Sequence, residues 1–214
     1  MKGMKRSNVT MIMRTLAAVV MASLGVVSVA HAAGTLGPMA TLKQKNGDVD
    51  KLLRQKVEKG TPAEQKQKDE IKRLAATLLD YDELAQKSLA MHWEKLTSPQ
   101  RNEFVSTLRE LIERNYVKQL RTNLDYQVQY KNEENEGEQA TVSTIVKVKS
   151  AGKNTDAEII YKMKKAADGW HVWDVITDEI SLVKNYRTQF NKIITEQSYD
   201  ALIKKMKSKL KDGE

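Results

Sequence analysis

The chain has 214 residues, 30% of them charged, with a net charge of +8 and no cysteine. Without disulfides, a domain of this size must be held together by its own apolar core, and the chain is long enough to bury one. The sequence lacks the clustered arginines and interleaved aromatic residues that are typical of a nucleic-acid-binding surface, so we exclude that class.

Residues 1–32 have the three zones of a secretory signal peptide. Four cationic residues and no acidic residue precede an apolar run, residues 15–29. This run is too short to be a typical membrane span. Small residues at Ala30 and Ala32 then suit cleavage before Ala33. We therefore expect export and one mature domain, residues 33–214, with a net charge of +4; an uncleaved N-terminal anchor is the alternative.

The first half of this domain is predicted to be helical after a short leader, residues 33–40. Apolar residues recur at helical spacing, and capping residues mark the helix starts. The predicted helical segments are residues 49–57, 61–79, 80–93 and 98–120, with caps at Thr61, Asp80 and Ser98.

The period then changes to strict alternation, which is typical of strands with one buried face. The predicted strands are residues 124–130, 142–148, 157–163 and 170–176, with turns at 132–139, 150–154 and 168–169. Two further helices, capped by Ser181 and Ser198, end the chain. The predicted fold class is α+β, with helices packed around a curled, mainly antiparallel four-stranded sheet.

No catalytic constellation is evident in the sequence. His92 and His171 are outside any metal-ligand spacing, and the glycine-rich phosphate loops and the GxSxG nucleophile motif are absent. Asp174 lies on an otherwise apolar strand face and needs a partner, for which Lys184 and Arg187 are candidates. A structural ion pair or a contact with a helix end is favoured over catalysis. We therefore predict a binding protein with no enzymatic activity, metal or cofactor.

Several segments carry a more specific signal. Trp93 is followed by Ser-Pro-Gln-Arg at 98–101, and later by Gly-Trp-His-Val-Trp-Asp-Val at 169–175 and Ser-Leu-Val-Lys-Asn-Tyr-Arg-Thr-Gln-Phe at 181–190. This order resembles the MlaC family, also called the toluene-tolerance family. Two features depart from it: Glu179 stands where many members have glycine, and the turn at 132–139 is unusually acidic.

The resemblance implies a soluble periplasmic phospholipid carrier of a Gram-negative bacterium with a cystatin-like or nuclear-transport-factor-like fold. Such a carrier shuttles lipid between an outer-membrane lipoprotein complex and the MCE-domain protein of an inner-membrane ABC transporter, and so maintains outer-membrane lipid asymmetry. The phospholipid would be cargo and not a cofactor.

The resemblance also implies an acyl-chain pocket between the sheet and the helices. Such a pocket must be deep and dry, because exposing acyl chains to water costs about 0.8 kcal/mol per CH₂. Tyr116 and Tyr186 are expected at its polar mouth, and Arg187 either binds a headgroup phosphate or pairs with Asp174. The alternatives are a periplasmic chaperone or adaptor with a basic helical surface, and a lipid hydrolase using Asp174 or His171. The predicted pocket residues are Leu108, Leu111, Ile112, Tyr116, Val142, Val146, Val148, Ile159, Tyr161, Met163, Trp170, Val172, Ile176, Leu182 and Tyr186.

Overall fold

The computed structural model describes residues 36–120, 126–150 and 153–211, so the expected signal peptide lies outside the described residues. The helical first half comprises α2 (Pro38–Leu53), α3 (Pro62–Leu78), α4 (Tyr81–Leu89), the 3₁₀-helix η2 (Ala90–Lys95) and α5 (Ser98–Leu120). The strands are β1 (Tyr126–Glu136), β2 (Gln139–Ser150), β3 (Lys153–Ala166), β4 (Gly169–Thr177) and β5 (Ile180–Ser181), followed by α6 (Leu182–Glu196) and α7 (Tyr199–Lys211). The α+β prediction is confirmed.

The strands form one antiparallel meander in the order β1-β2-β3-β4-β5. A short fifth strand, β5, therefore follows the four predicted strands at the edge of the sheet. The turn predicted at 132–139 was wrong, because β1 continues to Glu136 and only Gly137 and Glu138 turn the chain. Gly137 has a φ of +70°, which glycine adopts without steric cost. This end of β1 is exposed on both faces, so its residues are polar throughout and resemble a loop.

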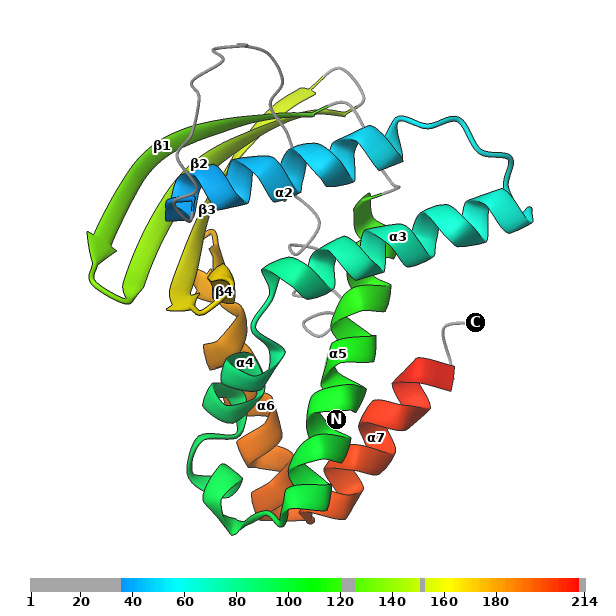
Figure 1. The fold of residues 1–214 in the computed structure, drawn as a ribbon. Coiled ribbons are helices and arrows are strands. Elements are labelled where there is room, and N and C mark those ends of the chain that lie inside the picture. Colours follow the sequence, from blue (N-terminus) through cyan, green and yellow to red (C-terminus); the bar gives the residue numbers. More distant parts are fainter. Residues whose placement is uncertain (1–35, 121–125, 151–152, 212–214) are drawn as a thin grey trace.

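The sheet curls around α2, which crosses its concave side, and α3 lies next to α2 (Figure 1). The helices α4, α5, α6 and α7 pack together beyond the β4 end of the sheet (Figure 1). Two apolar cores result. The sheet core lies between the concave face and α2, α3 and the end of α5, whereas the helical core lies among α4 to α7.

Most of the predicted helix caps are confirmed. The Thr61 hydroxyl accepts from the Glu64 N–H at 3.3 Å, and the Asp80 carboxylate accepts from the Glu83 N–H at 2.9 Å. Ser181 and Ser198 cap α6 and α7 in the same way. The cap of α5 is shifted by one residue, because Thr97 and not Ser98 accepts the N–H of Gln100, at 3.4 Å.

Helix α2 begins at Pro38, inside the expected leader, and ends before Val57. Its start is stabilised from a distance, since the Met39 N–H donates to Glu133 on β1 at 2.6 Å. A carboxylate at a helix N-terminus also interacts favourably with the helix dipole. The acidic segment of β1 therefore has a structural role in positioning α2 on the sheet.

The helix predicted at residues 80–93 is interrupted. Ala90 has a φ of +49°, so α4 ends at Leu89 and the chain continues as a 3₁₀-helix. Met91, an apolar residue of the predicted helix, is 70% exposed as a result.

A β-bulge in β4 changes which side chains face the sheet core. Val172 is paired with Met163 and Asp174 with Lys162, which leaves Trp173 as an extra residue. An extra residue reverses the alternation beyond it. Val175 therefore joins the sheet core in place of Ile176, so the predicted inward position of Ile176 was wrong.

The turn between β4 and β5 is strained. Asp178 and Glu179 both have positive φ values, +48° and +66°. In two-residue hairpin turns, positions with positive φ are usually occupied by Asn-Gly or Asp-Gly. We expect Glu179→Gly to raise the free energy of unfolding by about 0.5–1 kcal/mol, measured by urea denaturation. The matched control Glu179→Ala removes the charge but retains the strain and should not stabilise; an equal gain from Ala would contradict the conformational explanation.

An ion-pair cluster joins α4 to β3. The Glu83 carboxylate is 2.9 Å from Lys164 Nζ and 3.0 Å from Lys87 Nζ. Burial alone would raise the pKa of Glu83, but the hydrogen bonds and charges of these lysines outweigh it and lower that pKa.

The lowered pKa predicts a pH-dependent stabilisation. A carboxyl with a depressed folded-state pKa stabilises the fold above its unfolded pKa, near 4.5, and loses that contribution as the pH falls through its folded pKa. Because both lysines are partly exposed and screened, we expect Glu83→Gln to cost about 1 kcal/mol at pH 7 and less at pH 3. Urea denaturation at both pH values measures this; an equal cost at pH 3 would rule out the carboxylate charge as its cause.

Candidate functional site

The concave side of the sheet is lined by apolar side chains from all its long strands. Val142, Ile159 and Met163 have no exposed surface, and Val172 is 1% exposed. Opposite them lie Leu42, Val49 and Leu53 of α2 and Ile71, Ala75 and Leu78 of α3. The sheet and the first two helices thus enclose the interior that the sequence assigned to the pocket.

The predicted pocket residues are divided between the two cores. The sheet core contains Tyr116, Val142, Val146, Ile159, Tyr161, Met163, Trp170 and Val172, with Val148 at its edge. The helical core contains Leu108, Leu111, Ile112, Leu182 and Tyr186. In the latter, Phe104 and Phe190 meet edge to face at 5.5 Å and Tyr186 stacks on Phe190 at 5.1 Å.

Sequence reasoning missed the helices that face the sheet. The apolar stripes of α2 and α3 were recognised, but α5 was expected to oppose the strands along its length. Among the α5 side chains that the structure describes, Tyr116 and Val117, near the end of the helix, are the ones that belong to the sheet core. The amphipathic pattern identifies a buried face and does not identify its partner.

Four tyrosines bring hydroxyl groups into the mainly apolar sheet core: Tyr116 from α5, Tyr126 and Tyr130 from β1, and Tyr161 from β3. The Tyr130 hydroxyl accepts a hydrogen bond from buried Asn46 of α2 at 2.8 Å. The Tyr126 hydroxyl is buried and has no hydrogen-bond partner within the described ranges. A buried donor without a partner is costly, so it marks a place where a ligand acceptor would be favoured.

Burial keeps these tyrosines neutral. It is the main cause of the raised pKa of Tyr116, Tyr126, Tyr130 and Tyr161, and interactions among the tyrosines add to it for Tyr116 and Tyr161. Neutral phenols donate hydrogen bonds and provide no positive charge. The interior is therefore suited to a largely apolar molecule with a few neutral acceptors.

Asp174 does not pair with Arg187 or Lys184, which corrects the expected ion pair. Its carboxylate accepts from the Ser181 hydroxyl at 2.6 Å and from the Val183 N–H at 3.0 Å, at the start of α6. The contact with a helix end, the other structural interpretation, is the one present. Arg187 instead donates to the Lys87 carbonyl at 3.0 Å, on the surface.

The two histidines have local polar contacts. His92 lies 2.8 Å from the Asn191 side chain, and His171 lies 2.8 Å from Asp168. Across the described part of the chain, no group of three or more acidic or histidine side chains is arranged to hold a metal ion.

In the same part of the chain, no helix has the length and apolar character needed to cross a bilayer.

These features define an α+β domain in which helices cover the concave face of a curled antiparallel sheet around an apolar, tyrosine-containing interior. The model of the family described as "MlaC protein" matches residues 43–208. The chain belongs to the MlaC family.

Two known proteins are similar to this chain. The "Intermembrane phospholipid transport system binding protein MlaC" of Haemophilus influenzae is 25% identical over 122 residues, which span 56% of this chain and 57% of that protein. A phospholipid-binding protein of Ralstonia solanacearum, solved in complex with a phospholipid, superposes with a TM-score of 0.65 at 20% identity. That match covers 79% of this chain and 94% of the other, and it supports the fold.

Proposed function

We propose that this chain is a phospholipid carrier that holds acyl chains between the concave face of the sheet and helices α2, α3 and the end of α5. The observation that carries the proposal is the apolar sheet core with its buried Tyr126 hydroxyl, which has no hydrogen-bond partner among the described residues, in a chain that belongs to the MlaC family. Covering acyl chains removes the cost of exposing them, about 0.8 kcal/mol per CH₂. Binding and release of the lipid require no catalytic group.

The carrier is proposed to act in the periplasm after cleavage before Ala33. There it would take lipid from or deliver it to an outer-membrane lipoprotein complex and the MCE-domain protein of an inner-membrane ABC transporter, and so maintain outer-membrane lipid asymmetry. The similarity to a binding protein of an intermembrane phospholipid transport system supports this role. The mass of the mature protein from a periplasmic fraction tests the processing, since a chain that retains residues 1–32 would overturn it.

Lipid analysis tests the central proposal. Native mass spectrometry of the protein from the periplasm should show adducts with phospholipid masses, and solvent extraction should recover the same lipids. Protein that is isolated empty, and that takes up no phospholipid from vesicles, would contradict the proposal.

The Tyr126 hydroxyl is proposed to donate to an ester carbonyl of the bound lipid. Tyr126→Phe removes this donor, so we expect about fivefold weaker lipid retention in a vesicle-transfer assay. The same change should leave the lipid-free protein equally or more stable, because the buried hydroxyl has no partner in the described structure. Weaker retention accompanied by a less stable lipid-free fold would indicate a structural role instead.

A further inference from the structure

The outer surface of α7 is almost entirely cationic. The helix contains five lysines and one acid, Asp200, which lies in its first turn. All the lysines are exposed. We call this surface the lysine face of α7; it consists of Lys204, Lys205, Lys207, Lys209 and Lys211.

The opposite face fixes the helix to the domain. Leu202, Ile203 and Met206 are buried in the helical core. The Tyr199 hydroxyl donates to the Gln100 carbonyl at 2.7 Å, and Arg114 of α5 donates to the carbonyls of Lys209, at 2.6 Å, and Leu210. The lysine face is therefore held outward on a well-anchored helix.

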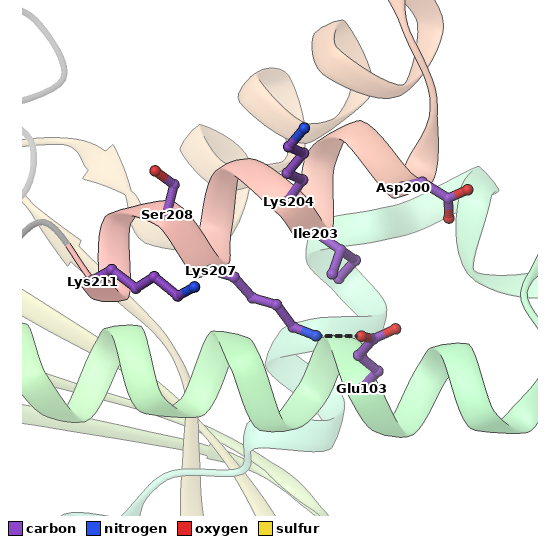
Figure 2. Close-up of a pocket in the computed structure, with 7 residues that line it drawn as sticks. All are labelled: Glu103, Asp200, Ile203, Lys204, Lys207, Ser208 and Lys211. Carbon is purple, nitrogen blue, oxygen red and sulfur yellow. Dashed lines mark hydrogen bonds and ion pairs between the residues drawn. The ribbon is translucent and has the colours of Figure 1, made fainter.

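A shallow groove of about 520 Å³ separates α7 from α5 (Figure 2). Lys207 reaches across it to Glu103, with 2.6 Å between Nζ and Oε1 (Figure 2). Lys204 and Lys211 also line the groove, and their ammonium groups form no ion pair or hydrogen bond with any described residue. The groove therefore has cationic groups that remain available to an anion.

Helices α3, α4 and α5 each neutralise a cation by an ion pair within the helix. Lys68 pairs with Glu64, Lys87 with Glu83, and Arg109 with Glu113, each at i,i+4 spacing. On α7 that spacing instead places like charges together, Lys205 with Lys209 and Lys207 with Lys211, which disfavours the helix. The helix dipole favours lysines only in the last turn, so it does not account for Lys204 and Lys205.

We propose that the lysine face of α7 docks the protein onto an anionic phospholipid bilayer. Lysine is a compact point charge without a directional requirement, which suits a fluid layer of phosphate headgroups. Protein interfaces are instead depleted in lysine and enriched in aromatic residues and arginine. The lysine face also lacks the exposed large apolar side chains that would favour a protein partner, because those of the described structure, Met91 and Ile180, lie outside α7. Docking extends the proposed carrier function, on which it rests, because a carrier must meet the membranes that it serves.

Co-sedimentation with vesicles tests the docking. Each lysine held near an anionic surface raises partitioning about fivefold, and salt screens the effect. We expect the protein to bind vesicles of phosphatidylcholine mixed with phosphatidylglycerol, and to bind pure phosphatidylcholine vesicles at least tenfold more weakly. Replacing Lys204, Lys205 and Lys209 together with glutamine should lower binding to the mixed vesicles at least tenfold.

The matched control has the same net charge, with glutamine at Lys59, Lys66 and Lys131, which are exposed outside α7. It should bind the mixed vesicles within about threefold of the wild type. Equal losses in the two variants, or wild-type binding that does not depend on anionic lipid, would overturn the proposal. Absence of binding even at low salt would also overturn it and would favour an acidic protein as the partner of α7.

The docking proposal and the carrier proposal can fail separately. Native mass spectrometry of the α7 variant should show the same phospholipid cargo as the wild type, because the substituted lysines lie outside the sheet core. Loss of vesicle binding with normal cargo supports docking, whereas a wild-type protein without cargo would contradict the carrier function alone.

Discussion

Val146→Trp should produce a folded protein that carries at least tenfold less phospholipid than the wild type. Val146 is fully buried at the centre of β2, on the concave face that is proposed to contact acyl chains. A tryptophan there would occupy space otherwise taken by lipid. If the lipid-free interior were instead completely filled, the added volume would cost about 1–3 kcal/mol or more in strain. Lipid extraction and thermal denaturation together distinguish these outcomes.

A series at the same position keeps the prediction testable if tryptophan prevents folding. Val146→Leu and Val146→Phe add less volume, so lipid content should decrease progressively from Leu to Phe to Trp. The matched control is Ile145→Trp, because neighbouring residues of a strand face opposite sides and Ile145 lies outside the sheet core. The control should retain its lipid. Unchanged lipid content across the Val146 series would place the acyl chains elsewhere and would leave a chaperone acting through its surface as the better hypothesis.

Local chemistry accounts for the parts of this fold that the sequence predicted. Strand positions followed from alternation, and Ser181 and Asp80 were identified as caps because each can accept an N–H three residues later. Such interactions involve neighbours in the chain. They do not depend on which distant elements come together.

The errors arose where distant residues decide the structure. Glu133 stabilises the start of α2 from 94 residues away, so residues 38–40, the end of the expected leader, are helical. The bulge at Trp173 moves Val175 inward, whereas the alternation in the sequence, interrupted only by Asp174, resumes at Ile176. A two-residue period cannot reveal an extra residue when both neighbouring positions are apolar.

The candidate site was predicted in the same uneven way. The strand residues of the sheet core were found because alternation selects one face of a strand. Tyr186 and Leu111 were assigned to the pocket, opposite the strands, but lie in the helical core, because periodicity contains no information on which helix covers the sheet. Leu42 and Ile71, which do cover it, were not assigned to the pocket.

Asp174→Ala should be among the most destabilising single substitutions in the domain, lowering the free energy of unfolding by about 3 kcal/mol. Asp174 is 5% exposed, and its carboxylate accepts from both the Ser181 hydroxyl and the Val183 N–H. Hydrogen bonds to a charged group contribute about 1.5–3 kcal/mol, and alanine leaves both donors without this acceptor. The melting temperature should fall by roughly 10 °C in differential scanning calorimetry.

The matched control is Asp168→Ala, which removes an exposed carboxylate that contacts only the surface residue His171 among the described side-chain contacts. Its stability should change by less than about 0.5 kcal/mol. Ser181→Ala should have an intermediate effect, because it removes one donor to Asp174 and the cap of α6 but leaves the Val183 bond. Below its melting temperature, the Asp174→Ala protein should still carry phospholipid. If Asp174→Ala had wild-type stability, the carboxylate would not anchor α6 to the sheet. If it instead lost a lipid-hydrolysing activity without losing stability, the catalytic interpretation of Asp174 would be restored.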